Sequence, residues 1–392
     1  MSGVSQKILD SMEASSWIRK MFEEGAKRAA EIGAENVFDF SIGNPVFEPP
    51  KEVNEALAQL ATIDTGGLHR YMPNQGLPET RDYIAGKLNS ETGLGLTNNE
   101  IIMSVGAGGG LNTVLKALLN PSEEVIVLVP YFVEYDHYIS NHGGVHKRVE
   151  TNEDFSLNFE NIAAAINKRT KAIIINSPNN PTGVVYSATE LQQLGQLLLK
   201  KSAEIGHTIT LLSDEPYRRI SYVGELPNIL NHYKNSIIIT SFSKDLALPG
   251  ERIGYMAVHP EHAEKDLLIQ AAVIALRILG FVNAPAIWQR VLPMIGDAMV
   301  DLTPYQANKD ILVNGLREMG YQVTEPGGAF YLFVKSPIAD DAEFIALAQK
   351  ENLLLVPGRA FGRPGYFRIS FCFATEKIEK SLPIFQKLIV SL

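Results

Sequence analysis

Five short runs of valine, isoleucine and leucine, separated by segments long enough for helices, constrain the fold of this chain most. They occupy residues 101–105, 125–129, 172–175, 209–212 and 237–239. Strands that are apolar on both faces, with helices between them, are typical of a mostly parallel sheet covered on both faces. We therefore expect an α/β fold with such a sheet in a large domain. Helices are expected at 78–91, 111–119 and 189–204, with a further strand within 252–258.

The C-terminal third of the chain has a different pattern. One long helical segment at 288–319 precedes four short apolar runs and two more helical segments. The runs lie at 321–324, 329–334, 353–356 and 366–371, and the helices at 342–351 and 375–390. This pattern predicts a smaller α+β domain built from the N- and C-terminal segments. The predicted division is an N-terminal arm and part of the small domain at 1–48, a large domain at 49–287 and the small C-terminal domain at 288–392.

Composition excludes several classes of protein. A net charge of −9 over 392 residues argues against nucleic acid as the main partner. The longest apolar stretch, 269–288, is interrupted by Arg277, Asn283 and Pro285, so no membrane span is expected. A single cysteine, Cys372, excludes an internal disulfide and is expected to be a packed core thiol. Without a signal-peptide pattern at the N-terminus, we expect a cytoplasmic protein.

No metal site is expected. The eight histidines form no ligand cluster. His137 and His142 lie five residues apart, and His259 and His262 three apart, but neither pair has a nearby set of carboxylates. We interpret these histidines as structural or surface residues.

A single lysine among hydroxyl groups follows the run at 237–239. Ser241 and Ser243 precede Lys244, and Arg252 comes eight residues after it. A lysine can form a Schiff base with the aldehyde of a cofactor, while hydroxyl groups and a guanidinium can hold its phosphate. The alternative is a surface loop with an ordinary solvated lysine.

Two further loops follow predicted strands. The loop at 176–183 holds three asparagines and two prolines, a composition that shapes a ligand-binding loop but also occurs in plain turns. After the next run, Asp214 and Tyr217 are expected to face one pocket. A carboxylate there can keep a heterocyclic nitrogen protonated, and a phenol can bond to a ring oxygen. The alternative for Asp214 is a helix N-cap.

A glycine-rich link at 104–111 joins a predicted strand to a helix. Backbone N–H groups at a helix N-terminus form a ready anion site. The link also resembles a dinucleotide-binding fingerprint, in which Gly106 and Gly108 fit but the third glycine falls on Leu111. No strand ending in an acidic residue follows about 20 positions later. The link therefore predicts a phosphate site and argues against a nicotinamide-dependent dehydrogenase.

Arg368 lies within the predicted strand at 366–371. An arginine in a strand can bind a substrate carboxylate with two hydrogen bonds. The alternative is an arginine on an edge strand that faces solvent.

Together these motifs resemble those of the class I and II aminotransferases, the pyridoxal-phosphate enzymes of the aspartate aminotransferase fold. They are Asn-Asn-Pro-Thr-Gly at 179–183, Asp-Glu-Pro-Tyr at 214–217, Ser-Phe-Ser-Lys at 241–244, Arg-Ile-Gly at 252–254 and Phe-Arg-Ile-Ser at 367–370. The motifs occur in the family's order across nearly the whole chain. The resemblance implies transamination between an L-amino acid and a 2-oxo acid, with pyridoxal 5′-phosphate as the cofactor. It also implies a homodimer with shared active sites.

The resemblance assigns catalytic roles to Lys244, Asp214 and Tyr217. Lys244 would bind the cofactor and move the substrate proton, which requires a pKa lowered by burial and nearby cations. Asp214 would pair with the pyridine nitrogen, and Asn180 and Tyr217 with the ring's phenolate oxygen. Arg368 would hold the substrate carboxylate, with Asn180 and the backbone of Gly43.

The resemblance also implies how the large domain holds the cofactor. Phe132 would stack on the ring, and Tyr71 would reach the phosphate from the neighbouring subunit. The other phosphate-binding groups would be Ala107, Gly108, Ser241, Ser243 and Arg252.

Two departures from the family pattern bear on the cofactor and the substrate. Glycines occupy 108–110, where the family often carries a side chain that adds a phosphate contact. Dicarboxylate-specific members place an arginine just before the segment that here is 283–286, and Arg277 is one position off. Aspartate or glutamate is favoured if Arg277 enters a partner's pocket, and a neutral or aromatic amino acid if it faces solvent. A C–S β-lyase of the same fold and a non-catalytic cofactor-binding sensor module are the alternative functions.

Overall fold

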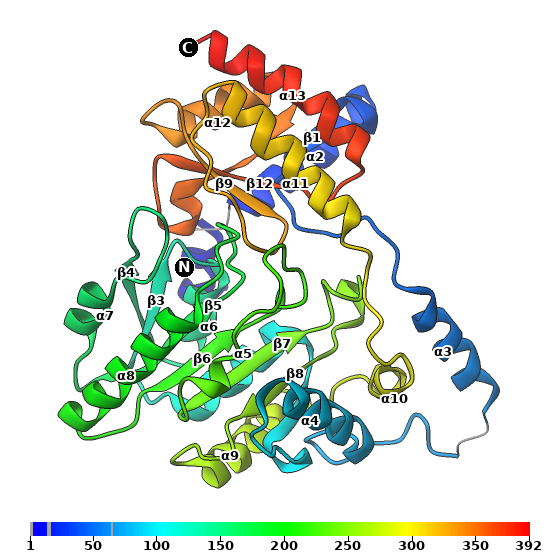
Figure 1. The fold of residues 1–392 in the computed structure, drawn as a ribbon, viewed down its shortest axis with the longest axis vertical. Helices are drawn as coiled ribbons and strands as arrows, with labels where there is room; N and C mark the ends of the chain where they lie inside the picture. The colour runs from blue at the N-terminus through cyan, green and yellow to red at the C-terminus, as the bar shows by residue number, and fades with distance from the viewer. Residues whose placement is uncertain (1–2, 14–16, 64–65) are drawn as a thin grey trace.

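The computed structural model describes residues 3–13, 17–63 and 66–392, and within these ranges a seven-stranded sheet forms the centre of the larger part (Figure 1). Across the sheet the strands are β2 (Ile101–Ser104), β8 (Gly254–Val258), β7 (Ser236–Ser241), β6 (Thr210–Asp214), β5 (Thr170–Asn176), β3 (Glu124–Val129) and β4 (Val145–Glu150). Only β8 runs antiparallel to its neighbours in this described sheet. The predicted, mostly parallel sheet is confirmed.

Helices cover both faces of the sheet. On one face lie α4 (Pro78–Thr92), α7 (Phe159–Ala165), α8 (Ala188–Ile205) and α10 (Ala286–Met294), and α3 (Lys51–Thr62) packs beside α10. On the other lie α5 (Gly106–Leu118), α6 (Glu134–Asn141) and α9 (Lys265–Ile278). Alternate side chains of β7 enter the two cores, with Ile238 in one and Ile237 and Ile239 in the other. This burial on both faces explains why the strands read as continuous apolar runs.

The smaller domain joins the two ends of the chain. Near the N-terminus, α1 (Gln6–Glu13) and α2 (Trp17–Ile32) precede β1 (Phe38–Asp39), which pairs in parallel with β10 (Leu353–Leu354). A three-stranded antiparallel sheet follows in the order β11 (Val356–Pro357), β12 (Tyr366–Ser370) and β9 (Tyr331–Lys335) within the described chain. Its helices are α11 (Thr303–Glu318), α12 (Asp341–Lys350) and α13 (Thr375–Val390). The predicted small α+β domain is confirmed, while its boundaries stay a prediction, and residues 1–2 and 14–16 of the arm lie outside the described residues.

The structure corrects two sequence predictions and adds one strand. The single helix predicted at 288–319 is two helices, because α10 ends at Met294, Gly296 takes a left-handed φ of 56° and Pro304 lies in the first turn of α11. The strand predicted at 321–324 is reduced to one isolated bridge between Val323 and Val334. Strand β4 was not predicted, because its exposed edge carries the polar sequence Val-His-Lys-Arg-Val-Glu.

None of the helices in the described ranges is long and apolar enough to cross a membrane. The same part of the chain contains no group of three or more histidine, cysteine or acidic side chains that could hold a metal ion. Cys372 is fully buried, as predicted, and burial raises the pKa of its thiol to about 11.

Candidate active site

A cavity of about 320 Å³ lies where strands β5, β6 and β7 end and the small domain meets the sheet. Because these strands are parallel, their C-terminal residues Asn176, Asp214 and Ser241 meet at one edge. The predicted site residues that line the cavity are Gly43, Ala107, Gly108, Phe132, Asn180, Asp214, Tyr217, Ser241, Ser243, Lys244, Arg252 and Arg368. Tyr71 alone of the predicted residues is elsewhere.

Lys244 follows β7 and points into this cavity. Its Nζ donates a hydrogen bond of 2.7 Å to the carbonyl oxygen of Gly43 and lies 5.6 Å from the ring centre of Phe330. Burial lowers the pKa of Lys244 to about 8, and the charges of Arg252 and Arg368 contribute in the same direction. The alternative of a solvated surface lysine is therefore wrong.

Asp214 is buried at the end of β6, so it is not a helix N-cap. Its Oδ2 accepts a hydrogen bond of 2.5 Å from Tyr135 Oη, while its Oδ1 is buried without a partner among the described residues. Burial raises the pKa of Asp214 to about 7, against the opposing effect of the bond from Tyr135. A protonated pyridine nitrogen supplies the donor and the positive charge that Oδ1 lacks, so this carboxylate fits pyridoxal phosphate.

The N-terminus of α5 forms an anion cradle at the other end of the cavity. The first N–H groups of a helix have no partner within it and attract negative charge. Gly106 has φ of +68°, a left-handed conformation that favours glycine, and a Cβ there would also displace Arg252, whose Nη2 would lie 2.8 Å away. Arg252 itself has a left-handed φ of 54°, a strained conformation for a residue other than glycine. With the buried Ser241 and Ser243, this cradle fits a phosphate.

Arg368 is buried in β12, the central strand of its sheet. Its Nη1 donates to Asn180 Oδ1 at 3.0 Å and its Nη2 donates to the carbonyl oxygen of Ser41. The guanidinium carbon lies 4.6 Å from the ring centre of Tyr331 and 4.9 Å from that of Phe361. The alternative of a solvent-facing arginine on an edge strand is wrong.

Three tyrosines of this cavity region were not predicted from the sequence. Tyr135 bonds to Asp214, Tyr138 lines the cavity, and Tyr331 lies with its Oη 2.9 Å from Tyr217 Oη. The sequence pattern could have indicated Tyr135 and Tyr138, since their three-residue spacing places them on one side of a helix that follows Phe132. Tyr331 carried no such signal, because only the docking of the small domain brings it to the large one.

Tyr71 and Arg277 lie on the surface of this chain. Tyr71 is 91% exposed, and Arg277 is exposed near the end of α9. Asn283 Nδ2 donates to the carbonyl oxygens of Met72 and Pro73 at 3.3 and 3.0 Å. These bonds hold the Tyr71 segment against the chain that follows α9, so both residues belong to one region of the surface.

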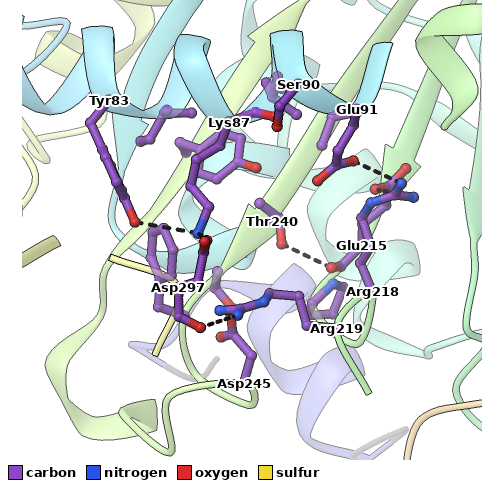
Figure 2. A pocket seen from close by; sticks show the side chains of 17 residues that line it. Tyr83, Lys87, Ser90, Glu91, Glu215, Arg218, Arg219, Thr240, Asp245 and Asp297 are labelled. Atoms are coloured by element: carbon purple, nitrogen blue, oxygen red, sulfur yellow. Dashed lines mark hydrogen bonds and ion pairs between the residues drawn. The ribbon is translucent and has the colours of Figure 1, made fainter. Parts of the chain in front are cut away.

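A second cavity, of about 210 Å³, shares a wall with the first, because Ser241 and Pro216 line both (Figure 2). It contains Glu215 and Asp245, the residues that directly follow Asp214 and Lys244. Both carboxylates are buried, and burial raises the pKa of each. Glu215 thus lies behind Asp214 and Asp245 behind Lys244, both on the side of the second cavity.

Two consecutive arginines pair with these carboxylates. Arg218 Nη2 lies 2.9 Å from Glu91 Oε2, and its Nη1 lies 3.6 Å from Glu215 Oε2. Arg219 Nη1 donates to Asp245 Oδ2 at 3.3 Å, and Figure 2 shows both arginines entering from one side of the cavity. Glu215 is held further by bonds from Ser213 and Thr240, so this network fixes the backbone behind the site.

The comparison with known proteins agrees with this geometry. Residues 35–382 match the family described as Aminotransferase class I and II. The chain belongs to this family. The aminotransferase is 34% identical to the probable aspartate/prephenate aminotransferase of Thermus aquaticus, over 98% of this chain and 99% of the relative. It is 30% identical to aromatic-amino-acid aminotransferase 2 of Thermococcus litoralis, over 95% of each chain.

Solved structures share the whole architecture of this aminotransferase. An amino transferase from Eubacterium rectale superposes with a TM-score of 0.96 at 40% identity, covering 100% of this chain and 99% of the other. An aspartate aminotransferase from Thermus thermophilus, solved with maleate, gives a TM-score of 0.85 at 28% identity, covering 99% and 100%. The protein is a pyridoxal-phosphate-dependent aminotransferase that moves an amino group between an amino acid and a 2-oxo acid. This activity is favoured over the β-lyase and sensor alternatives.

Proposed function

We propose that Lys244 is the catalytic lysine of this aminotransferase and that Asp214, Tyr217 and Arg368 complete the reacting centre. The observation that carries the proposal is one cavity that holds a lysine of lowered pKa, an anion cradle and a buried carboxylate, one oxygen of which has no partner among the described residues. Pyridoxal 5′-phosphate is the cofactor that we propose for this cavity. The residues present match its aldehyde, its ring nitrogen and its phosphate.

The proposed mechanism assigns each side chain one task. Bound pyridoxal phosphate supplies an electron sink for the bond between the substrate's α-carbon and its hydrogen. Lys244 in its neutral form takes that proton from the α-carbon and, later in the same half-reaction, delivers it to the cofactor. Asp214 holds the proton on the ring nitrogen, and Arg368 fixes the α-carboxylate so that the bond to be broken is oriented. The second half-reaction reverses these proton movements with another 2-oxo acid.

The remaining side chains bind the cofactor and the substrate. Asn180 and Tyr217 hydrogen-bond the ring oxygen, and Phe132 stacks on the ring. Asn180 and the backbone of Gly43 also assist Arg368 in holding the substrate. The phosphate is bound by Ala107, Gly108, Ser241, Ser243 and Arg252, with Tyr71 of the partner subunit. The supporting observation is that these groups of one chain line a single cavity, while Tyr71 is exposed outside it.

We propose a neutral or aromatic amino donor. Among the described residues that line the cavity, the cations are Lys244, Arg252 and Arg368, and each already has a task. The described lining leaves no fourth cation for a distal carboxylate. The cavity lining that has no task toward the cofactor instead includes the apolar Ile42 and the aromatic Tyr331. The relatives include both aspartate and aromatic-amino-acid enzymes, and a partner's Arg277 entering this cavity would favour the dicarboxylates.

We propose that the working unit is a homodimer. Helix α9 exposes a row of apolar side chains, with Leu267 at 67%, Ile274 at 57% and Ile278 at 64% exposure. This row, the α9 stripe, adjoins the surface that carries Tyr71 and Arg277. A shared interface there would bury apolar area and bring Tyr71 to the partner's cavity. The single buried cysteine agrees with the cytoplasm as the expected location.

The direct test is an absorbance scan of the purified protein. We expect a near-visible band of bound cofactor, which single amino acids convert to the amine form in the absence of any oxo acid. Neutral or aromatic amino acids should convert it fastest, whereas fastest conversion by aspartate would overturn the substrate proposal. Lys244→Ala should abolish the conversion, and retention of the wild-type rate would refute the assignment of Lys244. A protein that forms no band with added pyridoxal phosphate would refute the whole proposal.

A further inference from the structure

Position 108 in the anion cradle has no side chain, and another residue fills the space beside it. Tyr138, which projects from α6, places its Oη 3.0 Å from the point where a Cβ on Gly108 would lie. A side chain at 108 would therefore meet the phenol. The phenol therefore brings a hydroxyl group next to the first turn of α5, on the side where a side chain at 108 would project.

The surroundings of Tyr138 suit a hydrogen-bond donor to an anion. Tyr138 lines the same cavity as Gly108, Ser241, Ser243 and Arg252. Its hydroxyl has no hydrogen-bond partner among the residues that the structure describes. Burial and the nearby carboxylates raise the pKa of Tyr138, against the effect of Arg252, so the hydroxyl keeps its proton at neutral pH.

The neighbouring Tyr135 shows that the two phenols of α6 differ in use. Tyr135 lies three residues earlier on the same helix, and its hydroxyl is fully engaged by Asp214. Tyr138 is one turn further on and faces the N-terminus of α5 instead. The helix thus presents one phenol to the carboxylate that meets the ring nitrogen and a second phenol to the phosphate cradle.

We propose that Tyr138 donates a hydrogen bond to the cofactor phosphate, replacing the contact that a side chain at position 108 would make. The inference rests on the proposed function, because that function assigns the cradle to the phosphate. It adds a cofactor-binding residue from α6 that the sequence motifs did not contain. It also gives a reason for the glycine at 108, since a Cβ there would lie only 3.0 Å from the phenol oxygen and the phenol would have to shift.

The test compares two ligands that differ only in the phosphate. Full-length wild type and Tyr138→Phe are depleted of cofactor and titrated with pyridoxal 5′-phosphate and with pyridoxal, following the near-visible band. A lost hydrogen bond to a charged group should weaken binding of the phosphate form about tenfold or more, while pyridoxal binding stays unchanged. Tyr131→Phe is the matched control, because Tyr131 bonds to Asp136 and does not line the cavity.

A second variant keeps the inference falsifiable if the phenylalanine disturbs packing. In Tyr138→Phe combined with Gly108→Ser, a serine hydroxyl has the space that the phenol oxygen vacates and should restore part of the preference for the phosphate form. Equal weakening of both ligands without rescue would mean a packing role, and unchanged binding of both would mean no role, so either result overturns the inference. If wild-type protein bound neither ligand, the proposed function would fail first.

Discussion

Lys244 and Asp214 both titrate near neutral pH because burial acts on them in opposite directions. Burial lowers the pKa of the lysine to about 8 and raises that of the aspartate to about 7. Each group is poorly satisfied by the polypeptide alone. The lysine has a carbonyl oxygen as its hydrogen-bond acceptor, and one oxygen of the aspartate has no donor among the described residues. A ligand with an aldehyde and a protonated ring nitrogen relieves both.

The pKa of Lys244 predicts how capture of the cofactor depends on pH. Only the neutral amine attacks an aldehyde, and the neutral fraction grows as pH rises through about 8. We expect the rate at which cofactor-free protein regains its near-visible band to increase with pH and to level off above that value. Stopped-flow absorbance with excess pyridoxal phosphate measures it. A rate that is flat, or that falls over this range, would contradict the assigned pKa.

Tyr135 is expected to keep Asp214 ionised during turnover. Its hydroxyl donates to the carboxylate and thereby lowers the pKa of Asp214. Removing the donor in Tyr135→Phe should raise that pKa by about one to two units, since a hydrogen bond to a charged group contributes about 1.5–3 kcal/mol. The acid limb of kcat/KM against pH should therefore move to higher pH.

The pH profile of kcat/KM separates this positioning role of Tyr135 from a loss of packing. A variant that is merely less well packed would lose activity by a similar factor at every pH. Tyr131→Phe removes a phenol hydroxyl of the same segment that bonds to Asp136 outside the cavity, and it should leave the acid limb in place.

At the scale of elements, the strands that could be predicted from the sequence are those buried on both faces of the sheet. Strands β3, β5, β6 and β7 are covered on both faces, so their sequences are continuous apolar runs, and the loops after them carried the predicted site residues. Strand β4 lies at an exposed edge and has no such run. The break between α10 and α11 was missed although Gly296 and Pro304 mark it, because apolar residues continue on both sides of it. Tyr331 and the network around Glu215 depend on contacts between distant segments, which no local pattern encodes.

The network in Figure 2 predicts a pH-dependent cost for losing Arg219. Arg219→Ala leaves Asp245 buried without its cation, which should destabilise the protein by about 2 kcal/mol. This is less than for a fully buried pair, because Arg219 is 31% exposed. Burial already raises the pKa of Asp245, so protonation at lower pH removes the unpaired charge, and the deficit should shrink as the pH falls. Urea unfolding at several pH values measures it.

Two further variants identify the source of this cost. Arg219→Lys keeps the positive charge and should recover part of the stability. Arg317→Ala removes a more exposed arginine, whose partner is Glu325, and should cost well under 1 kcal/mol at every pH. A deficit in Arg219→Ala that does not change with pH would show that lost packing, rather than the charge of Asp245, is its cause.

At the scale of the whole molecule, the site depends on the pairing of the N-terminal and C-terminal segments in the small domain. β1 pairs with β10, which carries the segment containing Ser41 and Gly43 to the small sheet. Gly43 then accepts a hydrogen bond from Lys244 of the large domain, and Ser41 accepts one from Arg368. The groups that we propose to bind the substrate, from the N-terminal and C-terminal segments, therefore meet over the anion cradle of the large domain.

The α9 stripe predicts that assembly and cofactor retention are linked. Ile274→Asp places a charge in the centre of the stripe, where Ile274 is 57% exposed, and should convert a dimer to monomers. Leu199→Asp changes a 45% exposed leucine on α8 and should leave the dimer intact. Sedimentation velocity measures both.

If Tyr71 of the partner subunit holds the phosphate, the monomers should also lose cofactor on dialysis, whereas Tyr71→Phe should stay dimeric and bind cofactor about tenfold more weakly. Monomeric Ile274→Asp that retained cofactor as well as wild type would separate the two properties and refute a shared site.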